Sequence, residues 1–193
     1  MLPFLVSLYP FLHQIGTVAF CGKVIETIRG IKDNLSPYAE DSIVLLKYLT
    51  THDVISRWDV VSVHSRVNAS TAAHSLDTLE KRMPFPVRAI QVDGGAESEA
   101  VFEEAYRKRS IKLFVLPPRS PKLNGGVEQA HRTHTEEFYE VTESSFDLSE
   151  LKDELLEWEG VYNTVRPHQA LGYVTPLKFL EEWKECQGRR RCH

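Results

Sequence analysis

The chain has 193 residues, of which 42% are hydrophobic and 26% are charged. This composition is ordinary for a globular protein, and the length allows one domain with a full core, or one domain plus an extension. The formal net charge of −4 excludes a surface that is basic throughout, although it allows local basic patches that bind nucleic acid. Three cysteines form no disulfide framework and fit a reducing compartment.

The first 21 residues form an apolar run that contains no Lys or Arg. Pro3, Pro10 and Gly16 interrupt this run, which makes it a poor membrane span, and the charged start of a signal peptide is missing. We therefore expect no membrane association. We interpret residues 1–30 as an atypical N-terminal extension that precedes the core.

Three apolar runs follow with short connections between them. They cover Val24–Leu35, which ends near Asp33, then Ile43–Leu49 and Trp58–Val63. Neighbouring strands with short connections favour an antiparallel meander. The sequence therefore predicts three antiparallel strands at the start of the core.

Helical and strand patterns then alternate. A helical stripe covers 69–79, strands are predicted at 87–92 and 111–116, and helices are predicted around 101–106 and over 127–141. Such alternation indicates parallel strands joined by crossover helices. The sequence therefore predicts an α/β domain over 31–145, a mixed five-stranded sheet with helices on both faces.

Two more helices are predicted after this domain. Apolar residues at helical spacing run from Leu148 to Tyr162, and Thr175-Pro176 is typical of the start of a last, short helix. We expect residues 146–185 to form a helical C-terminal extension, followed by a basic tail over 186–193.

Two carboxylates stand at positions that suggest chemistry. Asp93 ends an apolar run and enters the Gly94-Gly95 turn, and Glu128 follows 35 positions later, just inside a predicted helix. Carboxylate oxygens are the ligands that hard divalent cations prefer, and such sites carry out phosphoryl transfer on nucleic acids. An Asp-Gly-Gly string is equally typical of an ordinary turn, so these residues alone leave both readings open.

Three longer strings carry a family resemblance. They are IQVDGGAES, LPPRSPKLNGGVEQAHRTHTEEFY and YNTVRPHQALGYVTP. They resemble the integrase-core domain of bacterial insertion-sequence transposases, which are relatives of retroviral integrases. The resemblance runs from about Leu46 to Trp183. It implies a ribonuclease-H-like fold and an Asp–Asp–Glu (DDE) triad that binds two Mg²⁺ (or Mn²⁺) ions.

The resemblance also assigns the acids of this triad. Asp93 matches the second acid and Glu128 the third, at the separation typical of the family. The first acid of the family normally ends the opening strand, and Asp33, in the string DNLS, is its best match. Asp53, which precedes Ser56-Arg57, matches a non-catalytic position, and we expect these three residues to be structural.

The chain departs from the family pattern in three places. Ser98 stands where an aromatic residue is usual, and Gln129 stands where an Arg usually follows the third acid. The chain before Asp33 resembles nothing in the family.

Polar and basic residues surround Glu128 in the sequence. Those that we predict to contact DNA phosphates are Arg119, Lys122, Asn124, His131 and Arg132. The alternative for this helix is a solvated surface with ion pairs to Glu136 and Glu137. In the YNTVRPH string we favour a structural role for Asn163, Arg166 and His168, because Asn163 and Pro167 are typical of a helix stop.

The resemblance implies a DDE-type DNA transposase that cuts DNA and transfers the cut strand to a target, which is DNA integration and transposition. Its partners would be the DNA of the element ends and the target, with a homo-oligomer assembled on them, in the bacterial cytoplasm at the nucleoid. Two alternatives stay open. One is a catalytically inactive, truncated remnant that binds DNA or a full-length partner, and the other is a ribonuclease-H-type nuclease that acts on RNA–DNA hybrids.

Overall fold

The computed structural model describes residues 17–25, 46–64, 69–92, 105–116, 125–142 and 147–190. The description below concerns these residues only.

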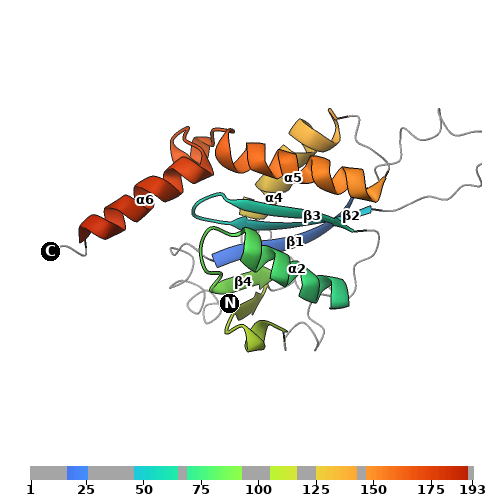
Figure 1. Ribbon diagram of the computed structural model, residues 1–193, viewed down its shortest axis with the longest axis horizontal. Coiled ribbons are helices and arrows are strands. Elements are labelled where there is room, and N and C mark those ends of the chain that lie inside the picture. The colour runs from blue at the N-terminus through green and yellow to red at the C-terminus, as the bar shows by residue number, and fades with distance from the viewer. Residues whose placement is uncertain are drawn as a thin grey trace, which may run out of the picture.

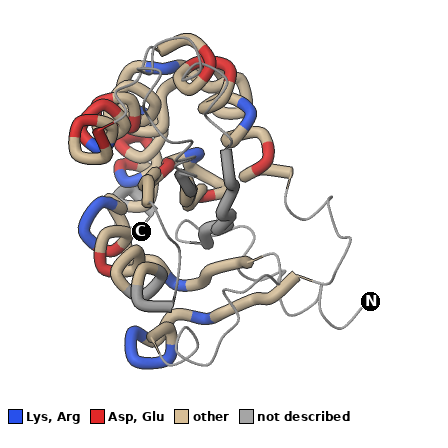
Figure 2. Tube along the Cα trace, turned by 90° about the vertical axis from the view of Figure 1, so that its right-hand side faces the viewer, with Lys and Arg blue, Asp and Glu red and all other residues tan. Residues whose placement is uncertain are grey.

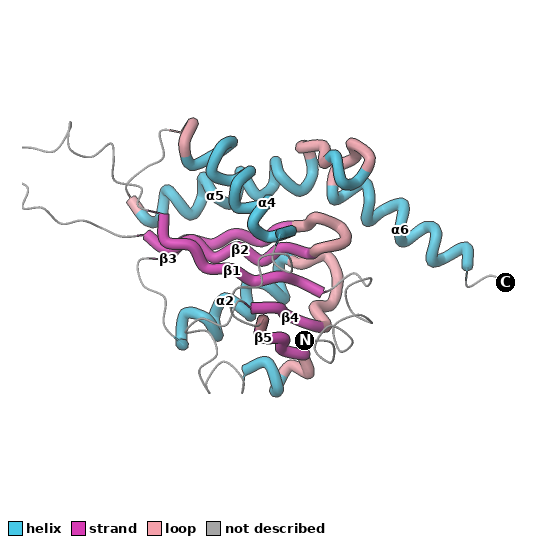
Figure 3. The backbone as a smooth tube through the Cα atoms, turned by 180° about the vertical axis from the view of Figure 1, so that it is seen from behind, coloured by secondary structure: helices cyan, strands magenta, loops and turns pink. Residues whose placement is uncertain are grey.

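One five-stranded sheet forms the centre of the protein, in the order β3-β2-β1-β4-β5 (Figure 3). Its strands are β1 (Thr17–Ile25), β2 (Leu46–Asp53), β3 (Asp59–His64), β4 (Ala89–Val92) and β5 (Lys112–Val115). β1, β2 and β3 are antiparallel, whereas β4 and β5 run parallel to β1. The predicted meander and the predicted mixed five-stranded sheet are both confirmed.

The position of the first strand differs from the prediction. β1 covers Thr17–Ile25 and overlaps the predicted strand, Val24–Leu35, in two residues. It lies between β2 and β4, so residues 17–25 belong to the core and not to an N-terminal extension. The prediction failed because the prolines earlier in the apolar run led us to treat all of that run as irregular. Asp33 lies outside the described residues.

Helices cover both faces of the sheet (Figure 1). Helix α2 (Ala69–Arg82) covers one face. The opposite face carries α4 (Gly125–His134), which continues as the π-helix η4 (Thr135–Tyr139), and α5 (Leu148–Thr164). The predicted helices at these places are confirmed, and the protein is a three-layer α/β domain.

The protein has two buried apolar clusters, one on each face of the sheet, and the alternation of side chains along β2 and β3 explains both. Leu49 and Val60 pack towards α2, in a cluster with Leu76 and Leu79. The neighbouring residues of these strands point the other way, where the second cluster contains Tyr48, Val61, Val63, Phe138, Leu151 and Leu155. Successive residues of a strand face opposite sides of the sheet, so two short strands supply both layers.

The C-terminal part is longer and more helical than predicted. After α5, a short turn, η5 (Gln169–Leu171), ends at Gly172, whose φ of 73° suits glycine. Helix α6 (Pro176–Arg190) then runs outward beyond the sheet (Figure 1). The predicted boundary of the tail at residue 186 is therefore wrong, because the helix continues through Gly188. In the described part of the chain, no helix is long and apolar enough to cross a membrane.

Helix α5 covers the free edge of the sheet at β3. Asn163 Oδ1 accepts a hydrogen bond from the backbone N–H of Asp59 at 2.9 Å, and Asn163 Nδ2 donates to the carbonyl of Asp59 at 2.8 Å. One helical turn earlier, Glu159 Oε2 accepts from the backbone N–H of Val61 at 2.7 Å. Arg82 of α2 pairs with Glu159 and donates to the carbonyl of Val61. Side chains thus complete the hydrogen bonds that an edge strand leaves open.

Replacing Asn163 by Ala should lower the free energy of unfolding by about 2 kcal/mol or more, because two buried backbone groups of Asp59 lose their partners. Urea denaturation measures this change. Thr164→Ala, at the exposed neighbouring position, is the matched control and should change stability far less. Equal stability of the two variants would contradict the role given to Asn163.

Glu159 should make stability depend on pH. Burial raises the pKa of Glu159 from 4.5 to about 7, although Arg82 and the N–H of Val61 oppose the rise. A raised pKa means that the folded state holds this proton more tightly than the unfolded chain. The stabilisation is therefore complete below pH 4.5 and is lost as the pH rises through 7.

The difference in unfolding free energy between wild type and Glu159→Gln isolates this effect, because the two proteins differ in this one side chain. The wild type should lose stability relative to the variant between pH 5 and pH 8, by up to about 3 kcal/mol. A difference that stays constant over this range would contradict the raised pKa.

Candidate active site

The structure describes the surroundings of two of the three predicted acids. β4 ends at Val92, directly before Asp93, and Val92 lies in register with Phe20 of β1 and with Val115 of β5. Asp93 itself, like Arg119, Lys122 and Asn124, lies outside the described residues. The strand end that precedes Asp93 is thus fixed at the centre of the parallel part of the sheet.

Glu128 lies in the first turn of α4 and is exposed. The helix buries Val127 and Ala130, so Glu128 is on its outward side. Gly126 fixes how close this turn comes to the sheet, since a Cβ placed there would lie 3.4 Å from Arg57 Nη1 and 3.5 Å from His52 Cδ2. The N-terminal turn of α4 is therefore held against the end of the β2–β3 hairpin.

Arg132 and His131 do not share one face of α4. Arg132 is exposed and forms an i,i+4 ion pair with Glu136, with Nε and Oε1 2.7 Å apart. His131 is only 5% exposed. The burial of His131 argues against the predicted contact between His131 and DNA phosphates, because the buried stripe of α4 runs through Ala130, His131 and His134. Arg132 remains placed to reach a phosphate, and His131 does not.

β1 supplies no carboxylate to this region. Its sequence, TVAFCGKVI, contains neither Asp nor Glu, although β1 is the strand that pairs with both β2 and β4. Among the residues that the structure describes, no group of three His, Cys, Asp or Glu side chains is arranged to hold a metal ion. A three-carboxylate site in this chain therefore needs its first acid from outside β1, and Asp33 is the candidate that the sequence offers.

The turn after β2 confirms the structural role expected for Asp53. Its Oδ2 accepts hydrogen bonds from the backbone N–H and from the hydroxyl of Ser56, both at 2.7 Å. Arg57 follows with a φ of 61°, and its backbone N–H donates to the carbonyl of Asp53 at 2.9 Å. Asp53 is fully buried, so its carboxylate serves the turn and is not available to a ligand.

A fully buried carboxylate that the sequence did not single out lies behind α4. Asp59 of β3 accepts a hydrogen bond from Nδ1 of His52 on β2 and another from Nε2 of His134, 2.8 Å away, at the end of α4. Arg57 Nη1 lies 3.3 Å from Nε2 of His52. Because a guanidinium only donates, Nε2 of His52 is the acceptor there and Nδ1 carries the proton given to Asp59.

The charge of Asp59 is stabilised by these partners. Burial by itself raises the pKa of a carboxyl group, but attraction to His52 and hydrogen bonds from both histidines hold the pKa of Asp59 well below its usual range. His134 also contacts α5, since the indole nitrogen of Trp158 lies 3.0 Å from its Nδ1 and the rings of His134 and Tyr162 are 4.7 Å apart. Asp59 thus connects β2, α4 and α5 in one polar cluster.

The other residues of the YNTVRPH string are structural, as expected. Arg166 pairs with Glu137 of η4 through Nη2 and Oε1 at 2.5 Å and through Nε and Oε2 at 2.7 Å. His168 is buried, its Nε2 lies 3.2 Å from the carbonyl oxygen of Tyr162, and its backbone pairs with Val174. These contacts fasten the end of α5 to η4.

Comparison with known proteins agrees with this arrangement. Residues 109–176 match the integrase core domain family. The chain is 25% identical over 146 residues to the "uncharacterized 39.2 kDa protein" of insertion element IS476 from Xanthomonas euvesicatoria, covering 74% of this chain and 41% of that protein. It is 27% identical over 124 residues to the 31.7 kDa protein of insertion element IS407 from Burkholderia multivorans, covering 63% and 43%.

The fold is also similar to that of a solved integrase. The crystal structure of the catalytic core domain of BIV integrase superposes with a TM-score of 0.64 at 15% identity, covering 90% of this chain and 99% of that one. The fold is therefore that of the ribonuclease-H-like integrase cores.

The matched stretch contains α4, which carries Glu128, and all of α5. This part of the chain is similar to integrase core domains, and a longer stretch of it is similar to proteins of insertion elements. The chain spans less than half the length of the two insertion-element relatives described above.

The variant Asp59→Asn should lower the free energy of unfolding by about 3 kcal/mol, because an amide N–H₂ faces a histidine donor where a carboxylate oxygen accepted. Hydrogen exchange should speed up most in α4, which His134 fastens to the sheet. Asp153→Asn, at an exposed position of α5, removes the same charge and should leave both measurements unchanged. A similar, small effect of both substitutions would contradict the role of Asp59.

Proposed function

We propose that this chain is the catalytic core of a DNA transposase, which cuts DNA at the end of a mobile element and joins the cut strand to a target. One observation carries the proposal: β4 ends directly before Asp93 beside the central strand, and α4 presents an exposed Glu128 from a turn held against the β2–β3 hairpin. The integrase-core match over 109–176 supports it.

Asp93 and Glu128 are two of the proposed ligands for two Mg²⁺ (or Mn²⁺) ions, and Asp33 is the third. Divalent ions bound there would activate a water or a 3′ hydroxyl and stabilise the leaving oxygen. Glu128 suits this role because its carboxylate is exposed and can bind a metal ion without rearrangement of the core. Asp33 would have to reach the site from the segment between β1 and β2.

The partners that we propose are the DNA of the element ends and of the target. Arg119, Lys122, Asn124 and Arg132 would contact its phosphates, since Lys and Arg give affinity that does not depend on sequence. A homo-oligomer would assemble on the two DNA ends, at the nucleoid in the bacterial cytoplasm.

A second candidate function has one observation in its favour. β1 contains no acid, although in the family the first acid ends the opening strand. A chain without that acid would fold and bind DNA or a full-length transposase, but would not cut. This candidate is a catalytically inactive remnant.

The two candidates differ in metal binding and in cleavage. The catalytic core should bind Mn²⁺ in calorimetry and nick DNA in the presence of Mn²⁺, and Asp93→Asn and Glu128→Gln should each lower nicking by more than about 1,000-fold with the fold retained. Glu157→Gln, at an exposed position of α5, is the control and should nick at the wild-type rate.

The variant Asp33→Asn decides the first ligand and should behave like Asp93→Asn. Wild-type nicking by Asp33→Asn would remove Asp33 from the site. DNA binding by the wild type without any Mn²⁺ binding or nicking would replace the catalytic proposal by the inactive remnant.

A further inference from the structure

Charge is unevenly distributed over the described part of the protein. Between Ala105 and Leu116 the chain has four basic residues and no acid, whereas α5 has five acids and one Lys. Figure 2 shows Lys and Arg gathered around the lower end of the molecule, while Asp and Glu are more frequent on the helical layer at the top. A chain with a net charge of −4 thus concentrates positive charge around one edge of its sheet.

The basic residues of this edge are exposed. We call them the β5 basic face, and they are Lys81, Arg88, Arg107, Lys108 and Lys112. Two contacts bring these residues together. The backbone N–H of Lys112 donates to the carbonyl of Arg88 at 3.0 Å, and the turn after residue 108 is bonded to the end of α2 through Arg109 and Glu80. The face therefore combines the end of α2, the start of β4 and the start of β5.

Arg109 fixes this turn through ion pairs with two acids of α2. Its guanidinium pairs with Asp77 and, at 3.2 Å, with Glu80, both on α2. Its Nη1 also donates to the carbonyl of Ala105 at 3.2 Å. Arg109, which is not part of the face, thus pairs with the two acids of α2 that lie beside it. Arg107 and Lys108, in the same segment, are exposed.

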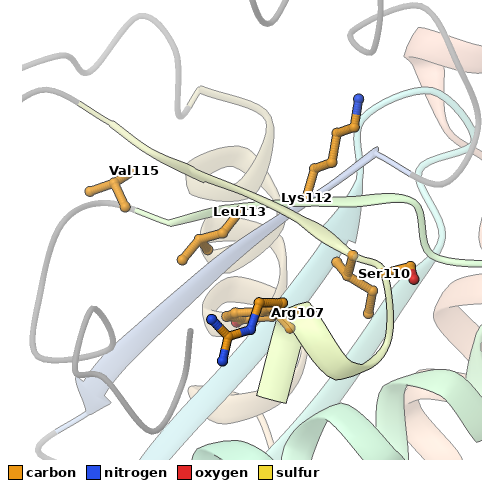
Figure 4. Close-up of a pocket in the computed structure, with 7 residues that line it drawn as sticks. Arg107, Ser110, Lys112, Leu113 and Val115 are labelled. Atoms are coloured by element: carbon orange, nitrogen blue, oxygen red, sulfur yellow. The ribbon is translucent and has the colours of Figure 1, made fainter. Parts of the chain in front are cut away.

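A hollow of about 460 Å³ lies along β5, lined by Arg107, Ser110, Leu113 and Val115 among others (Figure 4). Lys112 also lines the hollow, and Figure 4 shows its side chain extending away from that of Leu113. The hollow therefore combines a guanidinium, an ammonium group and an apolar wall. A sugar–phosphate backbone presents both charged and apolar surface to such a wall.

The hollow runs along β5, and the end of β5 lies beside the end of β4. From Lys112 to Val115 a strand rises by about 10 Å, and Val115 lies in register with Val92, directly before Asp93. A DNA strand that leaves the active site along β5 would reach Arg107 within a few nucleotides. The face and Val92, the residue directly before Asp93, thus lie at the two ends of the same pair of parallel strands.

We propose that the β5 basic face binds the phosphate backbone of the DNA next to the bond that is cut. This inference rests on the proposed function and adds to it a second contact surface, separate from the residues around Glu128. The contacts are sequence-independent, because Lys and Arg at an exposed edge meet phosphates and not base edges.

The test compares two triple variants with the same change in charge. Arg107→Gln, Lys108→Gln and Lys112→Gln together neutralise the face, and Lys152→Gln, Lys178→Gln and Lys184→Gln together neutralise three exposed positions on α5 and α6. Fluorescence anisotropy with a labelled duplex gives the Kd over a range of salt concentrations. Thermal unfolding checks the fold of each variant, and Arg107→Gln alone replaces the first triple variant if that variant does not fold.

Each phosphate contact contributes about 0.9 to the slope of log K against log salt. The face variant should therefore bind DNA at least about tenfold more weakly at moderate salt, with a slope reduced by about 2 to 3, and the α5–α6 variant should bind like the wild type. Equal binding by both variants would overturn the basic face and leave the proposed function intact. Absence of DNA binding by the wild type would contradict the proposed function itself.

Competition with polyglutamate shows whether the face binds DNA or an acidic polypeptide. If the face binds DNA, the face variant should lose affinity for the duplex and polyglutamate should compete only at great excess. Loss of polyglutamate binding with unchanged DNA binding would overturn the inference in favour of an acidic protein partner.

Discussion

The pairing of β1 with two partners holds the sheet together. β1 is antiparallel to β2 along eight residues and parallel to β4 along four, so it is the one strand that links the antiparallel half of the sheet to the parallel half. Every group discussed above is placed relative to it: the end of β4 before Asp93, the hairpin that carries Asp53 and Arg57, and the helix α4 that packs across β2. A chain without β1 would have two separate half-sheets.

The same strand bears on the first metal ligand. The family resemblance implies that the first acid ends the opening strand, and the sequence of β1, TVAFCGKVI, contains no acid. In the proposed catalytic core, Asp33 supplies the ligand that β1 lacks, whereas in the inactive remnant no residue does. The role of Asp33 therefore separates the two candidate functions.

Much of the fold could be predicted because local patterns determine it. Short-range spacing predicts the alternation of helices and strands after Ala69, and Pro84 predicts that α2 ends just before it. Turn chemistry predicts the structural roles of Asp53 and Asn163. The bounds of β1 could not be predicted, because a nine-residue apolar run with a Gly and a Lys becomes a strand only through partners 21 to 72 positions away.

Two further misses have the same long-range origin. His131 was assigned to the surface because spacing shows which residues share a helical face, but not which face packs on the sheet. Asp59 was missed because its partners, His52 and His134, stand 7 and 75 positions away and only the folded chain brings them together. A charged residue between two apolar ones in a strand is the single local signal that marks it.

The most direct test of this account is nuclear magnetic resonance of the labelled chain during a titration with Mn²⁺, whose unpaired electrons broaden the signals of nearby amides. A metal site between the end of β4 and the start of α4 predicts that the signals of Val92 and Glu128 broaden together, at low Mn²⁺, while those of the outer half of α6 stay sharp. Broadening that leaves Val92 and Glu128 unaffected, or that affects all exposed carboxylates alike, would contradict the account.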